Sequence, residues 1–214
     1  MRINRLLIIG LLCCCAVILV GCSKKEIKNI GARGKTIVCF GDSITFGYGV
    51  NPGEGYPSAL AKQLNIPVIN AGIDGDTSTE ALKRLDADVL SRDPLLVIIE
   101  FGGNDFLRQV PKEITVNNIK QMVERVQAHG AMVAIADISA GIFMREYRLA
   151  YRKIAQEKSA IFIPSILSGI ITNPSMKSDF LHPNAPGYKI IAEDIFRAIK
   201  PFLNQEIITK KTSG

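Results

Sequence analysis

A serine and a histidine that lie far apart in the sequence have the residue types needed for acyl transfer. Ser43 ends the string Gly41-Asp42-Ser43, and His182 is one of two histidines in the chain. A serine hydroxyl becomes an effective nucleophile when a base takes its proton, and an imidazole does this near neutral pH. Asp179, three residues before His182, can hold the other ring nitrogen and stabilise the imidazolium. We therefore predict a catalytic triad of Ser43, His182 and Asp179.

The tetrahedral intermediate of such a reaction needs hydrogen-bond donors for its oxyanion. The candidate donors are the backbone N–H of Ser43, the backbone N–H of Gly72 and the side-chain amide of Asn104. Gly72 has no side chain to hinder a close backbone approach. The spacing of the aspartates fits no oxygen-ligand loop, and the cysteines cannot form a metal site, so we predict no metal.

Apolar runs that alternate with amphipathic segments must position these residues. We predict strands at residues 36–40, 66–70, 95–101, 132–137 and 160–164, and helices at 57–64, 78–90, 115–129, 146–158 and 185–203. Continuously apolar strands that alternate with helices indicate a parallel sheet covered on both faces. The prediction is a three-layer α/β/α fold with five parallel strands in the order 2-1-3-4-5.

This strand order would bring the polar residues to one edge of the sheet. Ser43, Gly72 and Asn104 follow the first, second and third strands, which are neighbours in that order. Ligands of such sheets bind beyond the carboxyl ends of the strands, where the strand order reverses. Residues 165–178 form a loop long enough to return His182 to the same edge.

Four sequence blocks, in this order, resemble those of the SGNH (GDSL) hydrolase family. The blocks are Gly-Asp-Ser at 41–43, the glycine at 72, Gly-Gly-Asn-Asp at 102–105 and Asp-x-x-His at 179–182. Ser43, Gly72, Asn104 and His182 match the four residues that name the family, and Asp179 matches its triad aspartate. The strings at 70–78 and 100–108 are similar to the bacterial periplasmic branch of acyl-thioesterases, lysophospholipases and arylesterases.

The resemblance extends from about residue 36 to about residue 203 and implies a function. It implies a flavodoxin-like fold, no cofactor, and hydrolysis of small acyl esters, thioesters or lysophospholipids. No obligatory protein partner is evident from the sequence. Two alternatives stay open: a carbohydrate esterase that removes acetyl groups from a cell-wall polymer or glycan, and a non-catalytic binding lipoprotein. Residues 138–146 resemble the branch only weakly, so the preferred acyl chain length is left open.

The first 21 residues have the features of a bacterial lipoprotein signal peptide. Two arginines precede an uncharged apolar run from residue 6 to residue 20, and Leu19-Val20-Gly21-Cys22 resembles a lipobox. An uncleaved membrane anchor is the alternative, but the run is short for a spanning helix. We predict acylation of Cys22, a flexible tether at residues 22–35 and a hydrolase domain at residues 36–214. Ser23 is compatible with sorting to the outer membrane, facing the periplasm.

Charge and cysteine content agree with this arrangement. The net charge of +6 is concentrated in the signal and the tether, so the part from Thr36 onward is close to neutral. A basic tether suits anionic lipid headgroups, whereas a neutral domain gives no support for nucleic-acid binding. Outside the signal and Cys22, Cys39 is the one remaining cysteine, so no disulfide can form.

Overall fold

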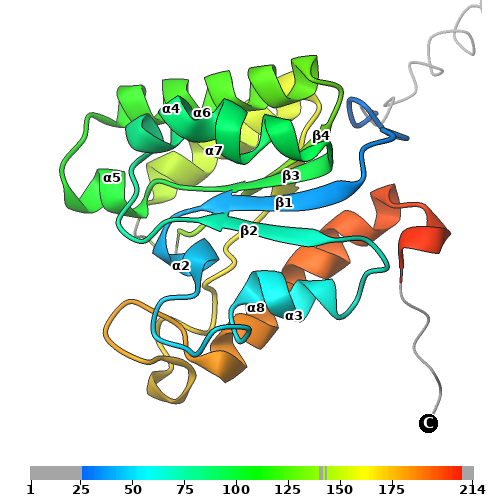
Figure 1. Cartoon of the computed structure of the whole chain (residues 1–214). Coiled ribbons are helices and arrows are strands. Elements are labelled where there is room, and N and C mark those ends of the chain that lie inside the picture. The colour runs from blue at the N-terminus through cyan, green and yellow to red at the C-terminus, as the bar shows by residue number, and fades with distance from the viewer. Residues whose placement is uncertain (1–25, 140–141, 143, 209–214) are drawn as a thin grey trace, which may run out of the picture.

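The computed structural model describes residues 26–139, 142 and 144–208, which form a three-layer α/β/α domain (Figure 1). The sheet consists of β1 (Thr36–Gly41), β2 (Val68–Gly72), β3 (Pro94–Glu100), β4 (Met132–Ala136) and β5 (Ile161–Ile163). All strand pairs are parallel and the order is β2-β1-β3-β4-β5, so the predicted fold and strand order are confirmed.

Two helical layers cover the two faces of this sheet. The α-helices are α2 (Ser43–Phe46), α3 (Tyr56–Ala61), α4 (Ser78–Asp88), α5 (Gly103–Leu107), α6 (Lys112–Ala128), α7 (Arg145–Lys158) and α8 (Ala185–Ile199). Short 3₁₀ segments lie at Leu90–Arg92, Pro174–Met176, Lys200–Phe202 and Gln205–Ile207. In Figure 1, α4, α6 and α7 lie above the sheet, and α3 and α8 lie below it.

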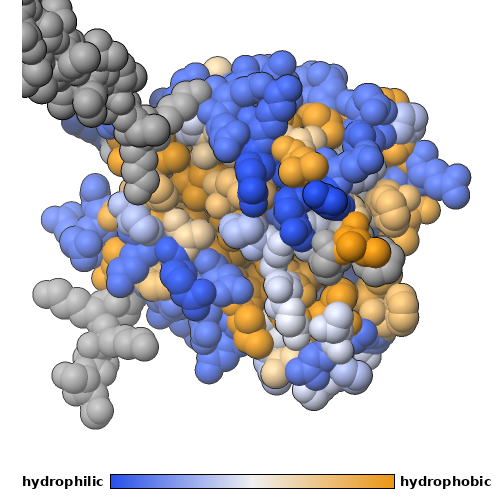
Figure 2. Space-filling model, turned by 180° about the vertical axis from the view of Figure 1, so that it is seen from behind, coloured by the Kyte–Doolittle hydropathy of each residue, from blue (hydrophilic) through white to orange (hydrophobic). Residues whose placement is uncertain are grey.

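Each helical layer encloses its own hydrophobic core against the sheet. Alternate residues of β3 enter the two cores, so that Leu96 and Ile98 face α8 while Val97 and Ile99 face α6. All seven residues of β3 are buried, which explains why this strand is apolar without alternation. Seen from behind, apolar surface gathers along the open edge of the sheet between the two layers (Figure 2).

Two short helices at the carboxyl edge differ from the loops that the sequence predicts there. α2 begins at Ser43, directly after β1, and α5 follows Gly102 at the end of β3. These helices have four and five residues, too few to show a 3.6-residue hydrophobic period. The ten longer predicted elements are present, with ends shifted by a few residues.

The segment before β1 also differs from the prediction of a flexible tether. Residues 27–35 lie against the domain, where Lys28 N–H donates to Ser159 O at 2.8 Å and Lys35 N–H donates to Asp93 O at 2.8 Å. Ile27 and Ala32 pack against the core of the α8 layer. Hydrogen bonds and apolar contacts therefore fix a segment whose Lys, Asn and Gly content is typical of a linker. Cys22 lies outside the described residues.

Within residues 26–139, 142 and 144–208, no helix combines the length and the apolar character needed to cross a bilayer.

Cys39 is buried in β1, and burial raises the pKa of its thiol to about 12, so it stays a protonated, unreactive side chain.

Candidate active site

The structure brings the three residues of the predicted triad together. His182 Nε2 lies 3.1 Å from Ser43 Oγ, and His182 Nδ1 lies 2.8 Å from Asp179 Oδ2. Both distances are within hydrogen-bond range, with the Ser43 hydroxyl donating to the ring and the ring donating to the carboxylate. Asp179 thereby fixes the imidazole tautomer that leaves Nε2 free to accept a proton.

A local turn positions the imidazole. Asp179 Oδ1 accepts hydrogen bonds from the backbone N–H groups of Leu181 and His182, at 2.7 and 2.8 Å. Partial desolvation opposes the shift, but these bonds and the imidazole contact lower the pKa of Asp179 to about 2. Asp179 is therefore ionised at every pH at which His182 can act as a base.

An aromatic contact that the sequence did not reveal supports the same ring. Tyr48, in the glycine-rich loop after α2, packs its ring against His182 with a centroid distance of 4.4 Å. Tyr188 Oη donates to Tyr48 O at 3.0 Å and ties this loop to α8. These contacts hold the loop beside the imidazole. Tyr48 could not be found from sequence because the contact spans 134 positions.

The nucleophile stands on a tight turn between β1 and α2. Asp42 caps α2, since its Oδ1 accepts a hydrogen bond from Ile44 N–H at 3.1 Å. A Cβ at Gly41 would lie 2.0 Å from Thr45 Oγ1 and 2.5 Å from Glu100 Oε2, so only glycine fits there. The turn thus fixes where Ser43 begins its helix, and Asp42 supports it through this cap.

Asp42 and Glu100 form a buried carboxyl pair behind the nucleophile. Glu100 Oε2 accepts hydrogen bonds from the Thr45 hydroxyl at 2.7 Å and from Asp42 N–H at 3.3 Å. Glu100 Oε1 is the one buried side-chain oxygen without a partner in the described part of the chain. Burial raises the pKa of Asp42 to about 7, and burial beside Asp42 raises that of Glu100 well above its ordinary value. The buried pair therefore holds its protons more tightly than exposed carboxyl groups do.

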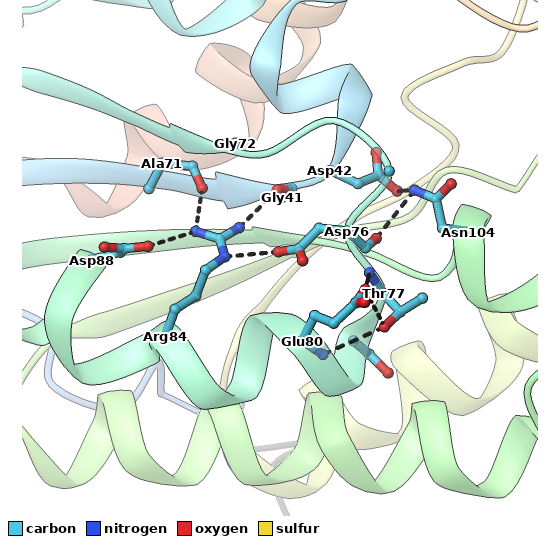
Figure 3. A network of polar contacts seen from close by, with 12 residues as sticks. Gly41, Asp42, Ala71, Gly72, Asp76, Thr77, Glu80, Arg84, Asp88 and Asn104 are labelled. Atoms are coloured by element: carbon cyan, nitrogen blue, oxygen red, sulfur yellow. Dashed lines mark hydrogen bonds and ion pairs between the residues drawn. The ribbon is translucent and has the colours of Figure 1, made fainter.

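Asn104, in α5, lies beside this turn and is held by two acceptors. Its Nδ2 donates to Asp76 O at 3.1 Å and to Asp42 Oδ2 at 3.3 Å. The longer bond to Asp42 aims the amide across the end of β1, toward the nucleophile turn (Figure 3). Both amide hydrogens are engaged, so donation to an oxyanion requires Asn104 to exchange one of these bonds.

A half-buried arginine that the sequence did not single out organises the loop on which Asn104 rests. Arg84, in α4, donates from Nε to Asp76 Oδ2 at 2.7 Å. Its Nη1 donates to Ala71 O at 2.9 Å and its Nη2 to Gly41 O at 3.3 Å, so one side chain links the ends of β1 and β2 (Figure 3). Thr77 and Glu80 form a capping box at the start of the same helix.

Gly72 does not suit the oxyanion role predicted for it. Its N–H donates to Asn70 Oδ1 at 2.9 Å, so the donor is already used inside the protein. A Cβ at Gly72 would lie 2.2 Å from Phe46 N, which shows that this glycine permits close packing of β2 on α2. Two glycines, Gly72 and Gly75, lie near the end of the second strand in the sequence. The hydrogen bond of Gly72 shows that it was the wrong choice as an oxyanion donor.

Gly75 is the better candidate on this loop. It has a positive φ of 78° in a turn closed by the hydrogen bond from Asp76 N–H to Ile73 O, and its own N–H has no acceptor among the described residues. The next residue accepts the hydrogen bond of Asn104, so the turn lies directly beside the second candidate donor. Arg108 Nη2 donates to Gly75 O at 2.7 Å and fixes the turn.

Asp105 and His129, which lie outside the triad, have structural roles. Asp105 accepts hydrogen bonds from Ser78 N–H, the Ser78 hydroxyl and the Thr115 hydroxyl, so it joins α4, α5 and α6. His129 follows α6 at its carboxyl end. The described residues contain no cluster of three or more histidine, cysteine or acidic side chains with the geometry to hold a metal ion.

A cavity of about 510 Å³ opens from Ser43 and His182. Besides the polar groups at its base, it is lined mainly by apolar side chains, namely Ile44, Phe106, Leu107, Ile138, Met144, Leu167, Ile171, Phe180 and Leu181. This volume is within the range of small-molecule sites. The arrangement joins an activated hydroxyl to a space suited to a hydrocarbon chain.

Comparisons with known proteins give the same assignment. The profile of the GDSL-like Lipase/Acylhydrolase family matches residues 39–190. The chain is 30% identical over 183 residues to thioesterase 1/protease 1/lysophospholipase L1 of Escherichia coli K12, covering 82% of this chain and 88% of that protein. The crystal structure of the psychrotrophic esterase EstA from Pseudoalteromonas sp., inhibited by monoethylphosphonate, superposes with a TM-score of 0.72 at 31% identity, over 80% of this chain and all of that one.

A shorter match concerns a protein named as a lipoprotein. Over 114 residues the chain is 32% identical to the uncharacterized lipoprotein YqeF of Bacillus subtilis, covering 47% of this chain and 46% of that protein. The family profile spans the nucleophile, Asn104, Asp179 and His182 in a single stretch. The chain belongs to the GDSL-like lipase/acylhydrolase family, the SGNH hydrolases.

Proposed function

We propose that this protein hydrolyses acyl esters in two steps through an acyl-serine intermediate. Ser43 Oγ attacks the carbonyl carbon while His182 Nε2 takes the hydroxyl proton and then gives it to the departing alcohol or thiol. Water attacks the acyl-serine in the second step while His182 takes its proton, and His182 returns that proton to Ser43 Oγ as the bond to the acyl carbon breaks and the acid leaves. Asp179 stabilises the imidazolium in both steps. The 3.1 Å contact between Ser43 and His182 carries this proposal.

The oxyanion donors in this proposal are the N–H of Ser43, the N–H of Gly75 and the amide of Asn104. Gly75 replaces Gly72, whose N–H is bonded to Asn70. The 3.3 Å bond from Asn104 to Asp42 is the longer of its two, so it is the one exchanged for the oxyanion. Removing one such donor typically costs about 3–4 kcal/mol of transition-state stabilisation.

The lining of the cavity favours an acyl chain as the group transferred. Nine apolar side chains line it, and burying one methylene group is worth about 0.8 kcal/mol. Acyl esters, acyl thioesters and single-chain lysophospholipids all carry such a chain. A carbohydrate acetyl esterase would present polar groups to sugar hydroxyls, and few line this cavity away from the triad, so it is the second candidate.

We propose in addition that the chain is a lipoprotein of the bacterial cell envelope, acylated on Cys22. The string Leu19-Val20-Gly21-Cys22 supports this, and so does the similarity to a protein named as a lipoprotein. Ser23 after the cysteine favours the outer membrane, with the domain facing the periplasm.

Labelling with a fluorophosphonate tests the nucleophile directly. The wild-type protein should react at Ser43, and the Ser43→Ala variant should not; a wild-type protein without label would support a non-catalytic binding lipoprotein. A panel of acetyl, butyryl and octanoyl esters, an acyl thioester, a lysophospholipid and acetylated xylan then tests the substrate class. Preference for acetylated xylan over the octanoyl ester would favour the carbohydrate esterase.

A further inference from the structure

Residues 27–35, here called the clasp, cross the end of the sheet at which the strands begin. Lys28 N–H donates to Ser159 O just before β5. Asn29 Nδ2 donates to Gln127 O in the last turn of α6 and to Ala131 O just before β4, both at 2.9 Å. Lys35 N–H donates to Asp93 O just before β3. In Figure 1 the clasp lies at the opposite end of β1 from α2, which carries the nucleophile.

The clasp is built into the domain and does not act as a spacer. Ile27 lines a mainly apolar hollow with Ala155 and Phe162, next to the open sheet edge seen in Figure 2. A Cβ at Gly34 would lie 2.2 Å from Pro94 C, so the chain runs in direct contact with the start of β3. Asn29 has a φ of 60°, a conformation that asparagine tolerates better than most residues.

A docked clasp leaves a very short link to the predicted lipid anchor. Only residues 23–26 separate Cys22 from Ile27, and even a fully extended chain would cover about 17 Å over that distance. The seven residues of β3 span about 20 Å, and the triad lies beyond the carboxyl end of the sheet. The link is therefore too short for the domain to turn its site toward a membrane that holds Cys22.

The charges at the two ends favour the same orientation. Lys28, Arg33 and Lys35 are exposed on or beside the clasp and suit an anionic bilayer surface. The cavity end is mixed in charge, with Asp74 and Asp179 exposed and Lys177 half-buried in the cavity lining, so it suits an anionic bilayer surface less well than the clasp does.

We propose that the clasp holds the active site away from the bilayer that anchors the chain, so that the substrate is an acyl ester arriving through the aqueous phase. The lipids of the anchoring bilayer are then outside the reach of Ser43. This proposal rests on the proposed esterase activity and on the proposed anchor at Cys22. It assigns the exposed apolar rim at Phe106, Leu107 and Phe180 to a substrate chain delivered from solution.

The test uses the full-length lipidated protein in vesicles of phosphatidylethanolamine and phosphatidylglycerol. One variant carries a Gly/Ser spacer of roughly 30 residues between Glu26 and Ile27, which adds a mean reach of about 30 Å. The control carries the same spacer after the last residue. Rates are measured on water-soluble p-nitrophenyl butyrate and on p-nitrophenyl palmitate dissolved in the same vesicles.

The spacer before Ile27 should raise the palmitate-to-butyrate rate ratio at least about tenfold, with the butyrate rate unchanged; the control should match the wild type. If the spacer before Ile27 leaves the palmitate-to-butyrate rate ratio unchanged, the proposal is wrong, whether the wild type and the variant hydrolyse the palmitate ester quickly or slowly. If the lipidated protein does not float with the vesicles, the proposed anchor at Cys22 is wrong and the proposal falls with it, but the proposed esterase activity is not contradicted. Absence of butyrate hydrolysis in all variants would instead contradict the proposed activity.

Discussion

The two halves of the triad are held by very different means. Ser43 is 8% exposed and stands on a turn whose neighbours, Asp42 and Glu100, are buried in the domain. The other half, Asp179 and His182, lies in a surface loop, where the Asp179 side chain is 43% exposed. Phe180 between them is 85% exposed.

This difference separates stability from activity. The nucleophile turn depends on the sheet, because Glu100 ends β3 and Arg84 links the ends of β1 and β2. The imidazole is oriented mainly within four residues, where the N–H groups of Leu181 and His182 donate to Asp179 Oδ1, and Tyr48 adds one ring contact from outside this loop. Changes in the first half should therefore alter folding as well as catalysis, and changes in the second half should alter catalysis alone.

The largest effect should follow removal of the nucleophile itself. Ser43→Ala removes the attacking oxygen, and kcat for p-nitrophenyl butyrate should fall by about 10⁴-fold or more, as in other serine hydrolases. The melting temperature should stay within a few degrees of the wild type, because one small hydroxyl is lost from an otherwise intact turn. Turnover equal to that of the wild type would exclude Ser43 as the nucleophile.

Asp179→Asn should cause the second-largest loss of kcat. It should lower activity without lowering stability, which distinguishes the loop half of the triad from the core half. The amide cannot stabilise the imidazolium, so kcat should fall by about 10²- to 10⁴-fold. The free energy of unfolding should change by less than about 1 kcal/mol because the site is exposed. Asp194→Asn, at a partly exposed aspartate on α8 that does not line the cavity, is the matched control. A destabilisation of several kcal/mol would show that the loop supports the fold.

Substitution of Glu100 tests the buried half through stability. Glu100→Leu leaves the Thr45 hydroxyl and Asp42 N–H without their acceptor, which should cost about 2–5 kcal/mol of unfolding free energy. Glu100→Gln keeps an acceptor oxygen and should cost clearly less. Urea unfolding at neutral pH measures both, and equal losses would contradict the assigned hydrogen bonds.

The same pair predicts how stability depends on pH. The folded state binds protons on Asp42 and Glu100 more tightly than the unfolded chain, because burial raises both pKa values, that of Asp42 to about 7. The contribution of these groups to the free energy of unfolding is therefore largest below about pH 4 and falls as the pH rises through about 7. Glu100→Gln should reduce this fall. A variant with the wild-type slope between about pH 4 and 8 would argue against a protonated Glu100.

The same contrast explains what could be predicted from the sequence. Asp179 and His182 are three positions apart, so their contact follows from local geometry. The strand order follows from apolar strands that alternate with helices. The meeting of Ser43 with His182 follows from that order and from the four sequence blocks of the family. The sequence did not reveal Tyr48 or Arg84, because their partners are distant in the chain. It also chose the wrong glycine, because φ and hydrogen-bond partners appear only in the folded chain.

The smallest predicted effect concerns the acyl chain. Leu107 is 60% exposed and lines the cavity, whereas Leu149 is 53% exposed on α7 and does not line it. Leu107→Ala should lower the ratio of kcat/KM for the octanoyl ester to that for the butyryl ester by about threefold to tenfold, since roughly 1 kcal/mol of apolar contact is lost. Leu149→Ala should leave the ratio unchanged, because α7 presents that side chain away from the substrate. Equal changes in the two variants would place the acyl chain outside this cavity, even though the serine and the imidazole still meet at its base.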